Sequence, residues 1–469
     1  MKCEFIQPIV MMLSRQKGFE FFGASAILLS KSLIASLVVV FSFFSQAYAS
    51  EQVSESSPRT GTLRYDVTFL PKKKAADVLV TLSGNHGLKS IDFNLSDSLC
   101  KSFQSENKLQ RAESRLEWFP DSVSESHISY RCKIKHRRES KQPGKFYDAF
   151  INNDWVVVRG DDLVPPAAVR RKNRARLMTE LHFVLPENWT SARTGWPLLD
   201  EENEEQRTSY RIDDDRRVFD RPTGWIIAGE LGTRAEYLDT QFSEFGSEIR
   251  IEVSAAADSN FKRMDTLAFL TAAWPSVDKA LRPVEKKLLV VGVGEPMWRG
   301  GLSAGNSFYV HEGRPLISEN GTSTLLHELF HMLSSIRGAK DSDWIAEGLA
   351  EYYSIEFLAR SGLTTNQRKQ KTLDTLRDWS ADVTSLLTDR STGKTTAAAV
   401  LLFSRLDAEI KQETQGRHNL DSLAQALVER AREGERISLE ILKKEFKELT
   451  KKTSSTLKSD LLADDARLD

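Results

Sequence analysis

The sequence predicts an α+β protein, in which a β-rich, sandwich-like domain over residues 61–255 precedes a mainly helical domain with a small sheet over residues 256–450. Two observations predict this order. Up to about residue 253, short runs alternate apolar and polar residues with the period of a strand. From Phe261 on, apolar residues recur at helical spacing. A chain of 469 residues also exceeds the usual size of a single core, so we expect two or three domains.

The first sixty residues differ from the rest of the chain. Basic residues precede an apolar run over residues 33–44, which ends in the small-residue pattern Ala47-Tyr48-Ala49. Because this order is typical of a secretory signal peptide, we expect residues 1–49 to be removed and residues 50–60 to form a polar linker. The protein would then be periplasmic or secreted, and an uncleaved signal segment would tether it to the membrane. Met11 and Met12 are alternative starts that would shorten the basic region.

Strand patterns fill the N-terminal domain. Leu63–Phe69 and Val78–Leu82 alternate apolar and polar residues, and turn signals such as Ser83-Gly84-Asn85 separate the runs. Long helical periodicity is missing, which favours a sandwich or a large open sheet. We expect this domain to act as a scaffold or as a rim for the substrate.

Two cysteines, Cys100 and Cys132, remain once a signal peptide that contains Cys3 is removed. An exported protein matures in an oxidising compartment, where these two residues can form a disulfide. The alternative is a pair of buried free thiols in separate strands, because spacing alone does not establish the geometry of a bond.

The second domain is expected to begin with a helix over residues 267–280 and a buried strand over residues 288–293. Helical segments dominate from Thr324 onward, and the last of them is expected over residues 437–449. Residues 451–469 contain few apolar side chains, so we expect a polar tail that frays.

Charge excludes some partners. The 65 basic residues nearly cancel the 66 acidic ones, and no long block of one sign occurs, so we expect no nucleic-acid partner. Gly393-Lys394-Thr395 is superficially similar to a phosphate-binding loop, but Thr388 stands where that motif needs glycine. We therefore expect no nucleotide partner, and membrane contact only through an uncleaved signal segment.

The chemistry is concentrated in His327-Glu328-Leu329-Phe330-His331. Two histidines four residues apart lie on the same side of a helix, where both can bind one tetrahedral zinc ion. A glutamate beside such an ion can take a proton from an activated water and act as general base, which is the role we assign to Glu328. The alternative is a pair of buried structural histidines.

A second helical segment one loop later carries two carboxylates, Glu347 and Glu351, in an otherwise apolar sequence. Glu347 would complete a site of two histidines and one glutamate for one zinc per chain. Glu351 lies one turn further on and could accept the free ring N–H of a zinc-binding histidine. The alternative for both is a solvated helix face.

These motifs resemble those of the gluzincin metallopeptidases, particularly the aminopeptidase N and glycyl aminopeptidase branches. The resemblance rests on H-E-x-x-H followed by W-x-x-E-G-x-A, and it extends more weakly over residues 285–450. It implies a thermolysin-like zinc catalytic domain behind a β-rich N-terminal half, a peptide or protein substrate, and hydrolysis of peptide bonds.

The resemblance also implies an edge strand that binds extended peptide through its backbone. Residues 300–309 occupy that place, and the candidate substrate-binding residues are Gly301, Leu302, Ser303 and Tyr309. Aminopeptidases of this kind hold the free amine of the substrate with a glutamate in that strand, whereas Ser303 and Ala304 stand at the matching positions here. Strict aminopeptidase specificity is therefore not expected.

A second departure concerns the tyrosine that these families use to stabilise the oxyanion. Thr392 stands at the matching position, and no tyrosine follows Tyr353. The loss of an oxyanion donor typically costs about 100- to 1,000-fold in rate. Another group must replace it or the enzyme is slow, and the candidates are Tyr309, His311, Arg417 and His418.

We therefore expect an exported zinc peptidase. Three alternatives stay open at this stage: a zinc-containing peptide-binding module with weak or no hydrolase activity, a zinc hydrolase of non-peptide bonds, and a structural envelope protein with no metal.

Overall fold

A computed structural model of the chain describes residues 61–463, except 123, 139–145, 173–176, 201–207, 215–218 and 243–247. Every element below belongs to one compact unit, Pro58–Asp469. The expected signal peptide and linker lie outside the described residues. In the part of the chain that is described, no helix is both long and apolar enough to cross a membrane.

The N-terminal region is built from strands whose inner faces share one core. Tyr65 and Val67 of one sheet are fully buried together with Ile91 and Phe93 of another, as strand alternation predicts. The first sheet has the order β14 (Ser209–Ile212), β12 (Leu177–Val184), β1 (Gly61–Leu70), β2 (Ala75–Gly84), β7 (Ser126–Lys133), β4 (Cys100–Gln104). The second has the order β11 (Ala167–Arg171), β3 (Leu88–Asn94), β6 (Arg115–Trp118), β5 (Leu109–Ala112).

Cys100 of β4 and Cys132 of β7 lie directly opposite each other in this region, and they form a disulfide. Of the two possibilities that spacing left open, the structure has the bonded one. The bond links neighbouring strands and lies within the core of the N-terminal region.

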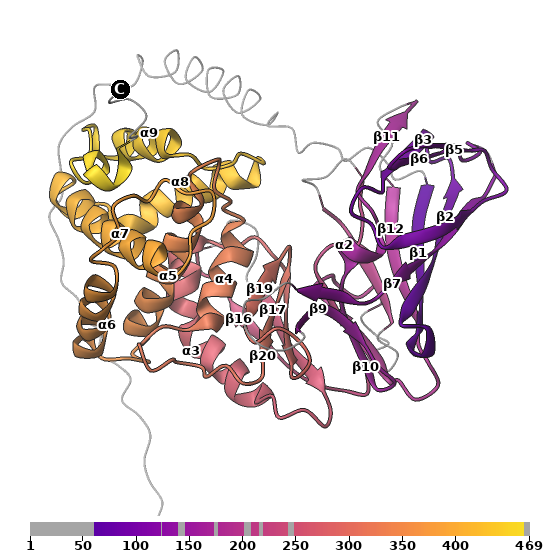
Figure 1. The fold of residues 1–469 in the computed structure, drawn as a ribbon, viewed down its shortest axis with the longest axis horizontal. Helices are drawn as coiled ribbons and strands as arrows, with labels where there is room; N and C mark the ends of the chain where they lie inside the picture. The colour runs from indigo at the N-terminus through magenta and orange to yellow at the C-terminus, as the bar shows by residue number, and fades with distance from the viewer. Residues whose placement is uncertain are drawn as a thin grey trace, which may run out of the picture. The chain divides into compact units, whose positions relative to one another are not determined.

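Two further sheets connect this region to the helices (Figure 1). The third has the order β13 (Ser191–Thr194), β15 (Trp225–Gly229), β10 (Trp155–Arg159), β9 (Phe146–Ile151), β8 (His136–Arg138). The fourth has the order β16 (Leu231–Asp239), β17 (Glu248–Ala256), β18 (Lys287–Val293), β20 (Ser307–His311), β19 (Gly301–Ala304). Val157 and Trp225 of the third sheet pack against Val291 and Tyr309 of the fourth.

One sequence-based assignment needs correction here. We placed the strands before residue 255 in the N-terminal domain, but β17 pairs in parallel with β18, which follows it after the helix α3 (Arg263–Leu281). β16 and β17 therefore belong to the sheet that carries the helices. Alternation shows that a segment is a strand but does not identify its partner, so the pattern could not reveal this.

Helices cover one face of the fourth sheet and form the C-terminal part of the chain. Phe308 and Val310 of β20 face these helices, while Tyr309 between them faces the third sheet. The longer helices after α3 are α4 (Thr324–Ser334), α5 (Asp343–Arg360), α6 (Asn366–Trp379), α7 (Lys394–Glu413), α8 (Leu420–Arg432) and α9 (Leu439–Thr450). The β-rich first half and helical second half confirm the predicted α+β class.

The described part of the expected tail is packed rather than frayed. Leu457 and Leu462 are buried against the helical core, in two short 3-10 turns at Thr456–Lys458 and Asp460–Leu462. The carboxylate of Glu409 accepts hydrogen bonds from the backbone N–H groups of Ser455 (2.6 Å) and Thr456 (3.1 Å). A few apolar residues and one carboxylate suffice to fix this segment, which its polar composition did not indicate.

Candidate metal centre

The first histidine pair lies on α4, as predicted. The Ser323 hydroxyl caps the helix by accepting the Leu326 backbone N–H at 3.4 Å. Apolar side chains on the other face bury the helix in the core, namely Leu325, Leu326, Leu329, Phe330 and Leu333. His327 and His331 lie one turn apart and project from the same side.

The helix α5 brings the carboxylates to this pair. Trp344 and Leu349 bury one side of α5. Gly348 lets it approach α7 closely, because a β-carbon there would lie 2.6 Å from the side chain of Ala399. Glu347 and Glu351 are thereby held on the side that faces α4.

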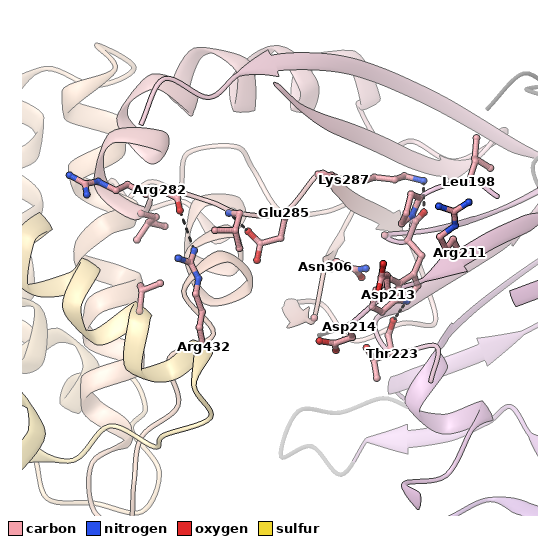
Figure 2. A pocket seen from close by; sticks show the side chains of 18 of the residues that line it. Leu198, Arg211, Asp213, Asp214, Thr223, Arg282, Glu285, Lys287, Asn306 and Arg432 are labelled. Atoms are coloured by element: carbon pink, nitrogen blue, oxygen red, sulfur yellow. Dashed lines mark hydrogen bonds between the residues drawn. The ribbon is translucent and has the colours of Figure 1, made fainter. Parts of the chain in front are cut away.

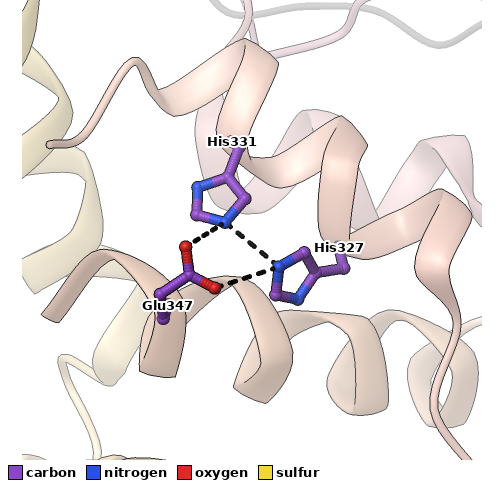
Figure 3. A group of neighbouring side chains, drawn as sticks. All are labelled: His327, His331 and Glu347. Atoms are coloured by element: carbon purple, nitrogen blue, oxygen red, sulfur yellow. Dashed lines mark hydrogen bonds and ion pairs between the residues drawn. The ribbon is translucent and has the colours of Figure 1, made fainter. Parts of the chain in front are cut away.

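His327, His331 and Glu347 converge on one point (Figure 3). The two Nε2 atoms are 3.1 Å apart. Glu347 Oε2 lies 3.5 Å from His327 Nε2, and Glu347 Oε1 lies 3.5 Å from His331 Nε2. Among the described residues, this is the one group of side chains that could hold a metal ion through three ligands.

The spacing fits zinc. Ligand atoms at about 2.0–2.1 Å from a tetrahedral ion are about 3.4 Å apart, which follows from the tetrahedral angle. The three distances, 3.1, 3.5 and 3.5 Å, lie close to that value. Two imidazoles and one carboxylate are also the donors that catalytic zinc sites use, with the fourth position left for water or substrate.

Glu351 fixes the orientation and the tautomer of the His327 ring. Its Oε2 lies 3.0 Å from His327 Nδ1, so a proton on Nδ1 is donated to the carboxylate and the Nε2 lone pair points at the cluster. Burial alone would lower the pKa of His327, but hydrogen bonds to Glu347 and Glu351 outweigh it and raise the pKa well above the usual value. A site that favours a proton so strongly also favours a metal cation.

Glu328 lies beside the cluster but is not one of its three converging groups. Its side chain is buried, and burial raises the pKa of its carboxyl, although the neighbouring His327 and His331 act in the opposite direction. The backbone of Ser303, on the neighbouring strand, also acts to lower the pKa of this carboxyl. A buried carboxylate of raised pKa is suited to accept and return a proton.

The strand beside Glu328 is β19, at the edge of the fourth sheet. Ala304 and Ser307 flank the two-residue turn Gly305-Asn306 and pair with each other. Because hydrogen-bonded and free pairs alternate along an antiparallel ladder, the backbone groups of Gly301 and Ser303 point away from β20. A β-carbon on Gly301 would lie 2.7 Å from Glu328 Cγ, so only glycine allows α4 this close.

A residue that the sequence did not suggest holds β19 from behind. The indole Nε1 of Trp225, on β15, donates to the carbonyl of Leu302 at 2.8 Å, and the Trp225 backbone N–H donates to Ser307 Oγ at 2.7 Å. The Trp225 ring also packs against Tyr309. No pattern in the sequence links β15 to β19, because the two segments are more than seventy residues apart.

The candidates for an oxyanion donor do not reach the cluster. The Tyr309 hydroxyl donates to the Trp298 carbonyl, on the sheet face that packs against β15. His311 Nδ1 accepts the Gly313 N–H at 3.0 Å, and burial lowers the pKa of its ring. Arg417 and His418 bond to Thr414 and Ser422 beside α8. Among described residues, none of these four has a hydrogen bond or ion pair to His327, Glu328, His331 or Glu347.

The segment that contains Thr392 lies at the start of α5. The Ser391 backbone N–H donates to Asp343 Oδ2 at 2.8 Å, one turn before Glu347. The Thr392 segment thus lies beside the helix that carries Glu347, and the ring of Trp379 lies next to it, 3.4 Å from where a β-carbon on Gly393 would stand.

No protein-family model and no curated protein matches this sequence. Solved structures do resemble it. An aminopeptidase N family protein from Idiomarina loihiensis aligns with a TM-score of 0.59 and 14% identity, over 80% of this chain and 72% of that protein. The aminopeptidase A of Legionella pneumophila, solved with aspartic acid, aligns at 14% identity and a TM-score of 0.49, and this chain spans 50% of its length. The chain therefore has a fold similar to that of an aminopeptidase N family protein.

Proposed function

We propose that this protein is an exported, zinc-dependent peptidase in which His327, His331 and Glu347 hold the metal. The observation that carries the proposal is the convergence of three zinc-type donors at 3.1–3.5 Å beside a buried glutamate. The aminopeptidase-like fold supports peptide bonds as the substrate. Export rests on the signal-like N-terminal sequence alone.

In the proposed reaction, zinc held by His327, His331 and Glu347 would supply a Lewis acid that acidifies water and polarises the scissile carbonyl. Glu328 accepts the proton of the attacking water on its carboxylate and returns it to the leaving nitrogen. Glu351 keeps the His327 ring in the tautomer that leaves Nε2 free. The edge of β19 aligns the peptide through the outward carbonyls of Gly301 and Ser303, next to Glu328.

The test pairs metal analysis with turnover. Purified mature protein and its Glu328→Gln variant are analysed for bound zinc and for cleavage of a mixed peptide library and of ester substrates. We expect one zinc per chain in both and a loss of rate of about 100- to 10,000-fold in the variant. Glu440→Gln is the matched control. Glu440 is exposed on α9, so its substitution removes one negative charge, as Glu328→Gln does, but at a surface site on another helix.

The outcomes separate the rival functions. Zinc without cleavage in either protein would favour a peptide-binding module, an alternative supported by the bonds that engage Tyr309 and His311 with Trp298 and Gly313. Cleavage of esters but not peptides would favour a hydrolase of non-peptide bonds. Protein without bound zinc after loading would refute the proposal.

A further inference from the structure

A large pocket lies at the turn end of β19, where the N-terminal region meets the helices. Its volume is about 1020 Å³, at the upper end of the ~300–1,000 Å³ typical of ligand sites, which often lie where domains meet. We call it the interdomain pocket. One wall is the segment Gly195–Leu199, the other is formed by α8 with the end of α3, and Lys287, Gly305 and Asn306 form the floor (Figure 2).

The pocket continues the line of the candidate peptide-binding strand. Gly305 and Asn306, in its floor, are the turn that follows β19. The chain reverses at this turn, so the turn lies only about two residues beyond Ser303 along the strand. At about 3.3 Å per residue, a peptide paired with β19 needs roughly two more residues to reach the pocket.

The floor offers donors for peptide carbonyls. The Lys287 ammonium has three N–H groups and meets the Trp196 carbonyl at 3.2 Å, Glu252 Oε2 at 3.2 Å and the face of the Tyr210 ring, whose centroid is 5.2 Å away. Asn306 lies in the floor and carries an amide with two N–H donors. Its Oδ1 packs against Gly195 and Gly224 rather than facing the pocket.

The walls suit side chains of varied type. The lining includes apolar residues from both sides of the pocket, namely Trp196, Pro197 and Leu198 before β14, and Leu281, Val284 and Val428 at the end of α3 and on α8. Charged residues of both signs share the lining, with Arg282 and Arg432 on the helical side and Asp213 and Asp214 on the other (Figure 2). Because charges of both signs line the pocket, the lining does not favour a ligand of one charge. Apolar walls together with a polar floor suit a polypeptide segment, which has both apolar side chains and polar backbone groups.

We propose that the interdomain pocket binds the part of a polypeptide substrate that extends past the turn end of β19, so that the protein acts on long, unfolded chains rather than on short peptides. This inference rests on the proposed peptidase function. The lack of a carboxylate at Ser303 and Ala304 is consistent with it, since no charged group on β19 marks the end of the substrate there.

Plug variants test the proposal. Gly305→Trp fills the floor, and the backbone tolerates a side chain there because a β-carbon would meet only Thr223 Oγ1 at 3.5 Å. Val284→Trp fills the opposite wall from a half-exposed position outside the hairpin. Gly305→Ala is the matched control, because it adds a β-carbon without filling the pocket. Each zinc-loaded protein is given random peptide pools of about four and about twelve residues, and initial rates are followed by mass spectrometry.

We expect the unaltered protein and Gly305→Ala to cleave the long pool with a kcat/KM about tenfold above that of the short pool, the effect of one or two additional contacts. Both tryptophan variants should lose this preference and keep the short-pool rate. Equal rates on both pools for the unaltered protein, or a length preference that survives Val284→Trp, would overturn the proposal. If Gly305→Trp slows both pools through the hairpin, Val284→Trp decides.

Failure of the peptidase function gives a different result. If no zinc-loaded protein cleaves either pool, the proposed function fails and binding is measured instead, by fluorescence anisotropy of a labelled pool of about twelve residues. Binding that Val284→Trp weakens about tenfold would support the pocket as a polypeptide site without turnover. Equal binding by both proteins would overturn it.

Discussion

Replacing Glu351 tests whether the cluster is built for a metal. Glu351→Gln keeps the size of the side chain but removes the charge that faces His327 Nδ1 at 3.0 Å. A neutral amide can still accept the ring N–H, but it no longer raises the electron density of the imidazole or opposes the wrong tautomer. Glu351 is not one of the three converging ligands, so the site itself stays intact.

The expected cost follows from its role. Loss of a carboxylate behind a zinc-binding histidine typically weakens metal affinity about 10- to 100-fold, or about 1.4–2.7 kcal/mol. The side chain of Glu351 is 21% exposed, so water partly replaces the lost contact and we expect the lower end of this range. The free energy of unfolding without metal should change much less, because the hydrogen bond is retained.

The assay is a competition titration of zinc against a chelator of known affinity, with thermal unfolding measured with and without zinc. Glu440→Gln, on the exposed side of α9, is the control for the loss of one carboxylate. A Glu351→Gln protein that binds zinc as tightly as the unaltered chain would refute the reasoning, since the contact to His327 would then be a mere surface ion pair.

Four further predictions address the surroundings of the cluster. Removal of the metal with a chelator should abolish peptide cleavage and lower the Tm, and zinc should restore both, because the ion binds only the folded cluster; unchanged unfolding would contradict a bound metal. Gly301→Ala should reduce cleavage strongly and destabilise the folded protein by about 1–3 kcal/mol, because the added β-carbon overpacks against Glu328 and Thr324. Gly305→Ala should have neither effect. Cleavage rates and thermal unfolding measure both variants. Trp225→Phe keeps an aromatic ring beside Tyr309 but loses the hydrogen bond to the Leu302 carbonyl. The kcat/KM for peptides should therefore fall about fivefold while the zinc affinity stays unchanged. A change in zinc affinity would argue against an effect through β19. Burial raises the pKa of Asp220 to about 6, so ionisation of this carboxyl disfavours the folded state, and its contribution to stability falls as the pH rises from the unfolded-state pKa through about 6. Asp220→Asn should therefore raise the Tm at neutral pH and leave the Tm nearly unchanged in acid. An equal shift of the Tm at both pH values would contradict the assignment.

The zinc-type cluster could be predicted from the sequence because its parts are local. His327 and His331 are one helical turn apart, and Glu347 and Glu351 are one turn apart on the next long helix, so helical periodicity fixes which side each pair occupies. One loop joins the two helices, and their apolar faces require them to pack together. The α+β class was predictable for the same reason, since strand and helix periods are read from neighbouring residues.

Contacts between distant segments were decided only by the tertiary structure. The pairing of β17 with β18, the indole of Trp225 behind β19, and the meeting of Gly195–Leu199 with α8 at the interdomain pocket each join segments whose patterns contain no information about the other. The position of Tyr309 shows the same limit: alternation predicts that it faces away from its neighbours, but which face carries the helices depends on packing. Backbone hydrogen bonds and apolar contacts do not distinguish among many similar strands and helices, so their partners are fixed only when the whole core is assembled.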